Sequence, residues 1–366
     1  MTPPVRKIAI NTGGGDAPGL NAVIRAVVMA GIQRGWEVCG IRDGYNGLLE
    51  PESYPEGGLV KLSRLAVMGI GHLGGTILGT TNRGNPLHYP RRAADGSETE
   101  HDRCDEVVQR FREQGFDALV SVGGDGSLEI AHSLAQKGLR VICVPKTIDN
   151  DLERTFMTFG FDSAVSFATE CLDRLHTTAT SHRRIMVVEV MGRYAGWIAL
   201  HAGMAGNAHV ILIPEIPYDL GVVAEYVKKR EARGRHYTLV VVAEGAKPAG
   251  GEPSYREGEG HRLGGIGLKV AEELEDRTGK EARCVVLGHL LRGGPPTSFD
   301  RVVALRFGAA AVRALEEGQT AVMVSLAPPT VRYEPLGEVV RRMKTVSTDS
   351  DTVRTARDIG ITFGDR

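Results

Sequence analysis

The feature that most constrains the fold is an alternation of short, β-branched apolar runs with stretches of helical pattern. The first run is Ile8–Ile10, and a helical stretch over about Leu20–Arg34 follows it. The later runs share this short length and strong apolar character: Val38–Ile41, Ala118–Val122, Val141–Val144, Ile185–Val190, Val210–Ile213, Leu239–Ala243 and Cys284–Leu287. Buried runs separated by helices indicate parallel sheets covered by helices. The sequence therefore predicts an α/β protein.

Length and charge narrow the class of protein further. The 366 residues are enough for two domains with full cores. The chain has 44 basic and 45 acidic residues, so its charge gives no support for nucleic acid or a membrane surface as a partner. No apolar run approaches a membrane span, and the N-terminus lacks a signal-peptide pattern. Five scattered cysteines without a CxxC pair favour a reducing compartment, so we expect a cytoplasmic protein.

The first chemically rich segment is the glycine turn Gly13–Gly19, which follows the first apolar run. Ligands of parallel sheets bind at the carboxyl ends of strands, which is where this turn is placed. The turn does not match the GxxxxGK[ST] pattern of P-loop nucleotide hydrolases. It also lacks the GxGxxG pattern, with its acidic residue, of NAD-dependent dehydrogenases. Taken alone, the turn could be no more than a tight strand-to-helix connection.

A second glycine turn, Gly123–Ser127, follows the run Ala118–Val122 and precedes a helical stretch over Leu128–Gln136. Backbone N–H groups of such a turn and the positive end of the next helix can bind phosphate oxygens. The carboxylate of Asp125 would repel phosphate unless a divalent cation lay between them. The sequence therefore predicts a Mg²⁺ site at Asp125. Two such turns at strand ends can face one polyphosphate.

A third segment, Pro145–Asp151, follows the run Val141–Val144 and contains the carboxylates Asp149 and Asp151 beside the hydroxyl of Thr147. This combination suits proton abstraction from an alcohol together with support of a metal ion. The alternative is an Asx turn that caps the next helix.

Four arginines lie next to predicted strands, and arginine forks bind phosphate monoesters through two oxygens at once. They are Arg184, Arg193, Arg283 and Arg292. A single surface arginine is usually only solvated, but four at successive strand ends favour a phosphorylated substrate. His289 lies beside Arg292 and two glycines, which favours a hydrogen-bond donor to substrate over a core histidine.

Five segments together carry a resemblance to a known family: GGGDAPGLNAVIR, GGDGS, PKTIDND, MGRYAG and LGHLLRGG, in this order from Gly13 to about Arg306. In these segments the chain resembles the phosphofructokinases, which phosphorylate fructose 6-phosphate at its 1-hydroxyl in glycolysis. A GGDG segment alone is also found in NAD kinases and lipid kinases, but those families lack TIDND followed by MGR. The resemblance implies two Rossmann-like parallel-sheet domains with the active site in the cleft between them. Residues 1–160 plus 291–335 would bind the phosphoryl donor, and residues 161–290 plus 336–366 the sugar phosphate.

The resemblance also implies roles for individual residues. Asp149 would be the base for the sugar hydroxyl, with Thr147 and Asp151 beside it, and Arg193 and Gly14 would stabilise the transferring phosphoryl group. The sugar phosphate would be bound by Thr147, Asp149, Met191, Gly192, Arg193, Glu244, His289 and Arg292. The phosphoryl donor and Mg²⁺ would be bound by Gly14, Tyr45, Arg83, Gly124, Asp125, Gly126 and Ser127. Arg184 and Arg283 match arginines that reach the 6-phosphate from a neighbouring subunit, which implies at least a dimer and favours a homotetramer built as a dimer of dimers.

The phosphoryl donor is ATP or pyrophosphate in this family, and two positions of the chain disagree. Pyrophosphate enzymes typically carry Asp after the metal-binding Asp and Lys before TIDND, whereas this chain has Gly126 and Lys146. An Asp at position 126 would repel an α-phosphate by roughly 4 kcal/mol at about 4 Å, and Gly126 removes that obstacle. A flexible lysine does not exclude a nucleotide. We therefore expect ATP as the donor, with pyrophosphate as the alternative.

A more distant alternative is a non-catalytic, nucleotide-sensing relative. The retention of Asp125, Asp149, Asp151 and Arg193 argues against it, because a binding module needs no base.

Regulation by small-molecule effectors is expected to depart from the bacterial pattern of this family. Arg25 and Arg64 persist, but Met29, His176 and His209 stand where that pattern has two arginines and a glutamate. The chain is therefore expected to respond poorly to ADP and phosphoenolpyruvate.

Overall fold

The chain divides into two compact units, each assembled from separate segments of the sequence. The computed structural model describes residues 4–82, 84–92, 98–255 and 263–366. Unit 1 comprises Met1–Thr147, Leu152–Gly160 and Arg292–Met343, and unit 2 comprises Ile148–Asp151, Phe161–Leu291 and Lys344–Arg366. Compared with the boundaries expected from the sequence, the last crossing comes after Met343 rather than after residue 335. The short stretch 148–151 also belongs to unit 2. The assignment of donor and sugar to the two units stays a prediction.

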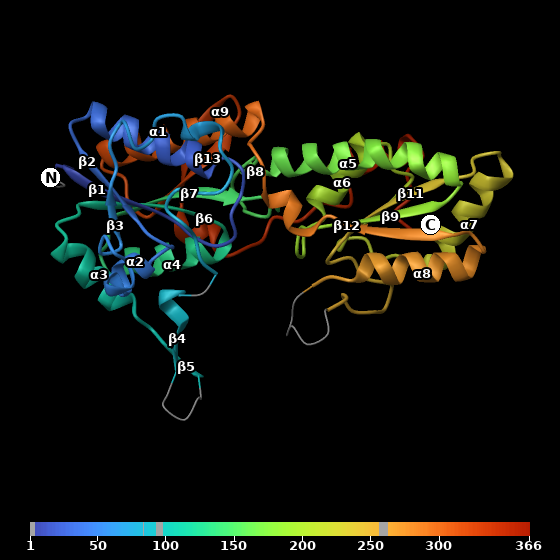
Figure 1. Ribbon diagram of the computed structural model, residues 1–366, viewed down its shortest axis with the longest axis horizontal. Helices are drawn as coiled ribbons and strands as arrows, with labels where there is room; N and C mark the ends of the chain where they lie inside the picture. The colour runs from blue at the N-terminus through green and yellow to red at the C-terminus, as the bar shows by residue number, and fades with distance from the viewer. Residues whose placement is uncertain (1–3, 83, 93–97, 256–262) are drawn as a thin grey trace. The chain divides into compact units, whose positions relative to one another are not determined.

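Unit 1 is built on an eight-stranded sheet in the order β14-β13-β7-β6-β1-β2-β3, with β8 beside β7 (Figure 1). The strands are β1 (Lys7–Thr12), β2 (Glu37–Ile41), β3 (Leu59–Lys61), β6 (Ala118–Gly123), β7 (Val141–Thr147), β8 (Phe159–Gly160), β13 (Val322–Ala327) and β14 (Thr330–Pro335). The sheet is parallel except at its two margins, where β3 and β14 run antiparallel to their neighbours. Every residue of β6 and β7 is buried, as expected for central strands between helical layers.

Helices cover both faces of this sheet. The helices α1 (Leu20–Gln33) and α9 (Ser298–Glu316) pack side by side on one face (Figure 1). A Cβ at Gly308 of α9 would lie 2.7 Å from the Cβ of Ala26, so the close approach of these helices depends on this glycine. The opposite face is covered by α3 (Cys104–Glu113) and α4 (Asp125–Gln136). Short elements complete the unit: α2 (Asn46–Leu49), η1 (Pro51–Ser53), η2 (Ile70–His72), η3 (Pro86–His88) and α10 (Leu336–Val339).

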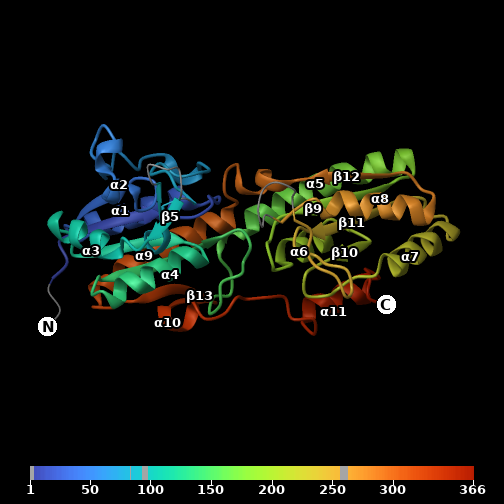
Figure 2. The ribbon, with the colours of Figure 1, turned by 90° about the horizontal axis from the view of Figure 1, so that it is seen from below.

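Unit 2 is built on a four-stranded parallel sheet in the order β10-β11-β9-β12. Its strands are β9 (Ile185–Val190), β10 (Val210–Leu212), β11 (Thr238–Ala243) and β12 (Ala282–Val286). One face is covered by α5 (Phe161–His182) and α6 (Trp197–Ala205), and the other by α7 (Leu220–Ala232) and α8 (Ile266–Thr278). The chain ends beside α11 (Asp351–Asp358) (Figure 2). Each of the eight apolar runs overlaps a sheet strand, which confirms the predicted α/β class.

The central strand β9 contains one buried carboxylate, Glu189, in an otherwise apolar sequence. Its two oxygens accept hydrogen bonds from the N–H groups of Gly265 (3.2 Å) and Gly267 (2.8 Å), at the start of α8. A negative charge at a helix N-terminus is favourable, so this contact attaches α8 to the sheet. No part of the chain that the structure describes forms a helix long and apolar enough to cross a membrane.

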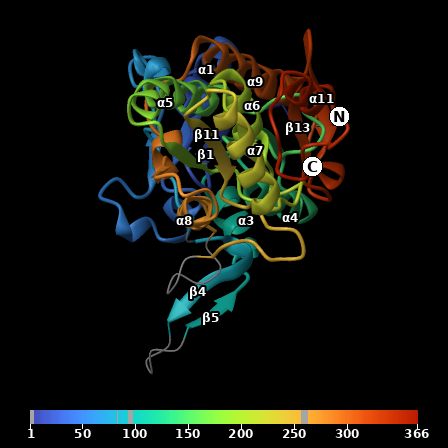
Figure 3. The same cartoon turned by 90° about the vertical axis from the view of Figure 1, so that its right-hand side faces the viewer.

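The segment Arg91–Arg103 is rich in polar and charged residues, a composition typical of a solvated connection, yet it contains most of a two-stranded hairpin. Strand β4 (Tyr89–Arg92) pairs antiparallel with β5 (Glu98–His101), and the hairpin stands out from the sheet of unit 1 (Figure 3). The polar composition correctly indicated exposure, but it did not exclude backbone pairing. An isolated hairpin is marginally stable in water, so its base must be attached to the unit.

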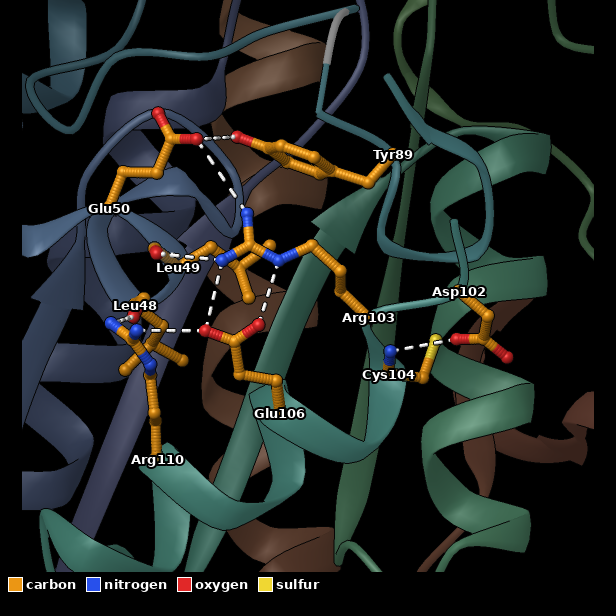
Figure 4. A network of polar contacts seen from close by, with 9 residues as sticks. All are labelled: Leu48, Leu49, Glu50, Tyr89, Asp102, Arg103, Cys104, Glu106 and Arg110. Carbon is orange, nitrogen blue, oxygen red and sulfur yellow. Dashed lines mark hydrogen bonds and ion pairs between the residues drawn. The ribbon is translucent and has the colours of Figure 1, made fainter. Parts of the chain in front are cut away.

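The attachment is a network of charged and aromatic side chains (Figure 4). Tyr89 donates its hydroxyl to Glu50 at 2.7 Å, and the Arg103 guanidinium lies 4.5 Å from the centre of the Tyr89 ring. Arg103 also donates two hydrogen bonds to Glu106 of α3, and Arg110 pairs with the same carboxylate at 2.8 Å. The hydrogen bonds from Arg103 lower the pKa of Glu106. The hairpin is thus joined to α3 through one shared arginine.

Candidate functional site

The two glycine turns predicted to bind phosphate are neighbours in unit 1. Strands β1 and β6 are paired with Thr12 opposite Val122, and the N–H of Gly13 donates to Val122 O at 2.9 Å. The hydroxyl of Ser127 lies against both turns. A Cβ at Gly13 would come within 2.7 Å of Ser127 Oγ, and one at Gly123 within 2.2 Å. Side chains are therefore excluded at both positions, and the turns present backbone.

A loop after η2 supports the first turn. Gly14, at φ +73°, donates its N–H to Thr81 O at 3.3 Å and accepts a hydrogen bond from Thr80 Oγ1 at 2.5 Å. A phosphate bound by the Gly14 N–H would have to replace the first, long contact.

Tyr45, predicted to bind the phosphoryl donor, is only 4% exposed, and its hydroxyl lies 3.4 Å from Ser121 Oγ. Burial raises the pKa of Tyr45. Arg83 lies outside the described residues.

The second turn leads directly into α4, which begins at Asp125 after Gly124. Asp125 and Gly126 are exposed, whereas Ser127 is buried. The first N–H groups of a helix lack partners within the helix and carry the positive end of its dipole, so an anion is favoured here. Within the described ranges, no group of three or more His, Cys, Asp or Glu side chains is arranged to hold a metal ion. Mg²⁺ on polyphosphates is usually bound by one or two carboxylates plus phosphate oxygens, which fits Asp125.

Two cationic side chains contact the first turn. Lys146, on buried β7, donates from Nζ to Gly15 O. Arg292 donates from Nη1 to Asp16 O at 3.1 Å. Both are suited to offset the negative charge of a polyphosphate. Arg292 was predicted to bind the sugar phosphate. The structure places it in unit 1 at this turn, whereas most of the predicted sugar residues belong to unit 2.

The predicted base lies in the stretch that continues β7 into unit 2. Thr147 ends β7, and its carbonyl accepts a hydrogen bond from Thr158 Oγ1 at 2.8 Å. Asp149 is 4% exposed, and Asp151 is buried as well. Asn150 lies between them with φ +53°, in the left-handed region that non-glycine residues rarely adopt. The structure thus places two carboxylates in a buried, conformationally unusual loop.

The carboxyl ends of β9 and β11 meet at the MGR segment of unit 2. Glu244, directly after β11, accepts hydrogen bonds at Oε1 from the N–H groups of Gly192 (3.3 Å) and Arg193 (3.0 Å). Gly192 has φ +146° and Arg193 has φ +49°, so the carboxylate holds a turn of unusual backbone conformation. Met191 is half-buried and Arg193 is exposed. His289, after β12 in η4 (Gly288–Arg292), is exposed, which excludes the core-histidine alternative.

Arg184 and Arg283 lie at the opposite end of the same sheet. Arg184 directly precedes β9, and Arg283 is the second residue of β12. Both arginines form ion pairs with Glu281. Strand β9 has six residues, and at about 3.3 Å per residue it separates the two ends by about 20 Å. The four arginines therefore do not form one set. Only Arg193 and Arg292 lie on the carboxyl side of the strands.

Several residues around the site carried no sequence signal. Thr80 and Thr158 each donate a hydroxyl hydrogen bond to a backbone carbonyl. Lys344 contacts the loop of unit 2 that holds Asp149, and Trp197 contacts Lys344. Single polar residues far along the chain have no motif, so only the three-dimensional arrangement identifies them.

Parallel sheets with glycine turns suited to phosphate, adjacent cations and buried carboxylates at strand ends are typical of α/β phosphotransferases. Residues 7–315 match the family model described as phosphofructokinase, and the chain belongs to that family.

Three of its relatives bear on the phosphoryl donor and the fold. The chain is 52% identical over 362 residues to the ATP-dependent 6-phosphofructokinase of Chloroflexus aggregans, covering 98% of both chains. It is 48% identical over 346 residues to the pyrophosphate–fructose 6-phosphate 1-phosphotransferase of Amycolatopsis methanolica, covering 93% of this chain and 96% of that one. The crystal structure of Pichia pastoris phosphofructokinase in the T state is similar with a TM-score of 0.78 and 32% identity, over 98% of this chain and 37% of that chain.

Proposed function

We propose that the chain transfers the γ-phosphoryl group of ATP to the 1-hydroxyl of fructose 6-phosphate, which gives fructose 1,6-bisphosphate. The observation that carries this proposal is the pair of adjacent glycine turns, the second of which leads directly into α4. The membership of the phosphofructokinase family and the relative from Chloroflexus aggregans support the same reaction.

On the donor side, residues of unit 1 bind and orient the polyphosphate. The N–H groups of the glycine turns and of the first turn of α4 donate hydrogen bonds to phosphate oxygens, and Lys146 and Arg292 offset the negative charge of those oxygens. Asp125 would hold Mg²⁺, which supplies charge neutralisation of the β- and γ-phosphates when bound.

On the acceptor side, residues of unit 2 bind the sugar and move its proton. Asp149 accepts the proton of the 1-hydroxyl late in the transfer, and the Arg193 guanidinium stabilises charge on the transferring phosphoryl group. The binding site for the sugar phosphate is lined by Met191, Gly192, Glu244 and His289. Because Glu244 also holds the backbone of Arg193, its loss would disturb both sugar binding and charge stabilisation.

The position of Arg184 and Arg283 supports a homo-oligomer. Both lie about 20 Å along the sheet from Glu244, so we assign them to the 6-phosphate of a neighbouring subunit in a homotetramer. Light scattering tests this directly, because a tetramer has four times the 39.4 kDa of the chain.

Pyrophosphate is the second candidate donor, and a specific contact favours it. Lys146 lies against the first turn, and pyrophosphate-dependent relatives such as the Amycolatopsis methanolica enzyme are 48% identical. Gly126 favours ATP. It is exposed, and apart from its chain neighbours and the backbone of its own helix no described atom lies within 4 Å of a Cβ built there. This space leaves room for an α-phosphate.

A donor-swap experiment separates the two candidates. One preparation is assayed with fructose 6-phosphate and Mg²⁺, using ATP in one series and pyrophosphate in the other. We expect kcat/KM with ATP to exceed that with pyrophosphate by at least about tenfold, a difference of about 1.4 kcal/mol. Turnover with pyrophosphate alone would overturn ATP as the donor, and turnover with neither would overturn the proposed reaction.

A further inference from the structure

A short backbone segment near the C-terminus contacts the loop that carries the predicted base. The N–H of Lys344 donates to Asp151 O at 2.8 Å, and Lys344 Nζ donates to Asn150 Oδ1 at 3.3 Å. All of these residues belong to unit 2. One residue therefore holds the loop at two points, one on the main chain and one on a side chain.

The loop has a backbone conformation that needs such support. Asn150 is buried and has φ +53°, and it separates Asp149 from Asp151. Asn tolerates the left-handed region better than most residues, but strained conformations persist only where the surroundings hold them. The two contacts from Lys344 fix the peptide on the C-terminal side of Asp151 and the side-chain amide of Asn150.

Lys344 is itself held by Trp197, the first residue of α6. The indole N–H donates to Lys344 O at 3.0 Å, and Lys344 Nζ lies 5.2 Å from the centre of a Trp197 ring. A cation over the face of tryptophan is attracted by the ring. The ammonium group is thus placed between an aromatic face and the Asn150 amide, which restricts a side chain that is otherwise flexible.

The same segment is attached to the MGR turn through Glu215. Its carboxylate accepts hydrogen bonds from the N–H of Gly196 at 3.0 Å and from the N–H of Val346 at 2.8 Å. Gly196 ends the segment that begins with Met191 and contains Arg193. Burial raises the pKa of Glu215, and the backbone hydrogen bonds oppose that rise. The segment 344–346 therefore connects the loop of Asp149 with the turn of Arg193.

We propose that Lys344 is a positioning residue that holds the Asn150 loop, and through it the Asp149 carboxylate, in the geometry for proton transfer. This proposal rests on the proposed function. It assigns no contact of Lys344 with substrate. A catalytic group must be held in a defined position relative to the reacting atoms, and a displacement of about 1 Å can lower the rate about a hundredfold.

The test compares three variants by steady-state kinetics and hydrogen exchange. Lys344→Met removes the charge and keeps a similar length, and Lys344→Arg restores a cationic donor. Lys280→Met is the matched control, because Lys280 is a largely buried lysine of the same unit that pairs with Glu231 at 2.6 Å. All rates are taken per folded protein, below the melting temperature of each variant.

We expect Lys344→Met to lower kcat about tenfold to a hundredfold, with both KM values within about twofold of wild type. Lys344→Arg should recover most of kcat, and Lys280→Met should leave it unchanged. Amide exchange in a peptide covering residues 148–151 should accelerate in Lys344→Met and not in Lys280→Met.

Either an unchanged kcat or unchanged exchange in Lys344→Met would overturn the proposal. A rise in KM with an unchanged kcat would do so as well, because it indicates substrate binding. The exchange measurement needs no turnover. If the wild type were inactive with both donors, the proposed function would fail, while the exchange result would still report whether Lys344 holds the loop.

Discussion

The two units carry chemically different sets of candidate site residues. In unit 1 the phosphate turns consist of backbone, and the glycines are required because the Ser127 hydroxyl occupies the space beside Gly13 and Gly123. In unit 2 the functional groups are side chains, and other side chains hold them. Glu244 holds the turn of Arg193, and Lys344 holds the loop of Asp149.

This difference determines how each set responds to substitution. A backbone turn next to a helix N-terminus binds any anion of suitable size, so changes there should alter donor affinity and donor choice. Side-chain chemistry depends on the position of single groups, so changes in unit 2 should alter the rate of transfer or the binding of the sugar phosphate. Four predictions test this division, from the largest expected effect to the smallest.

Replacing the predicted base should have the largest effect. Asp149→Ser should lower kcat by about a thousandfold to ten-thousandfold, because a positioned base contributes rate enhancement of about that order. KM for the sugar phosphate should remain nearly unchanged. Steady-state kinetics with Asp276→Ser as an exposed control checks this. Ordinary turnover in Asp149→Ser would mean that another group accepts the proton.

Replacing Gly126 should change the donor and not the chemistry. Gly126→Asp has space for its Cβ, so the protein should fold. Its charge should weaken ATP binding by about 4 kcal/mol, roughly a thousandfold. Gly126→Ala is the control for added bulk and should change ATP affinity little. Titration of both variants with ATP measures this. Equal losses in the two variants would show that size, and not charge, governs this position.

Removing Arg283 should weaken binding of the sugar phosphate. Arg283→Ala should raise KM for fructose 6-phosphate about tenfold to a hundredfold, because a charged hydrogen bond contributes about 1.5–3 kcal/mol. The similarly exposed Arg277, on α8, provides the control Arg277→Ala. Mixing inactive Asp149→Ser with Arg283→Ala sharpens the test. Hybrid oligomers should regain sites of low KM if the arginine acts across subunits, and should not if it acts within its own chain.

The smallest effect concerns stability and pH. In unit 2 the ring of His209 lies 5.4 Å from that of Tyr237 and 6.4 Å from that of His176. Burial, followed by the nearby Arg230, lowers the pKa of His209 to about 3. The unfolded chain binds this proton near pH 6.5 and the folded chain does not, so the free energy of unfolding should fall as the pH drops from about 6.5 towards 3.

His209→Gln cannot take up this proton. Melting temperatures measured between pH 7 and pH 5 should therefore decline less steeply in this variant than in wild type. Equal slopes in the two proteins would assign the acid sensitivity to other groups.

The weak response to ADP that the sequence predicts can be checked on the wild-type protein by dose-response curves of activity against ADP concentration.

Much of the fold could be predicted because its signals are local. Buried β-branched runs identified most of the central strands, and the two glycine turns were visible because a missing side chain is a property of single positions. The outer strands β3 and β14 and the exposed β4–β5 hairpin escaped prediction, since their residues alternate or are polar and resemble loops. The two-residue β8 escaped as well, and so did the buried β13, although its sequence VMVSLA is an apolar run like those of the predicted strands. Glu189 escaped because an acidic residue in an apolar run shows no sign of the helix N-terminus that it contacts.

The site could be predicted only as far as its motifs extend. The paired turns were expected to face one polyphosphate, and the structure confirms that they are neighbours. The assignment of Arg292 to the sugar, the roles of Asp149 and Asp125, and the contact of Tyr45 with a nucleotide stay predictions. Lys344 was out of reach because its partners, Asn150 and Trp197, lie more than a hundred residues away, at separations of 194 and 147.

The margins of the unit 1 sheet have a consequence for handling the protein at high concentration. Outer strands present unpaired N–H and C=O groups that can recruit strands from other molecules and start aggregation. Here one margin is β3, only three residues long, and the other is β14, which carries Arg332 and Glu334 and ends at Pro335. The short β3 offers few groups for pairing, and β14 carries charged side chains and a proline that lacks an N–H. Each margin is therefore a poor template for pairing with a strand of another molecule. The central parallel strands are thereby shielded from amyloid-like stacking while the native state persists.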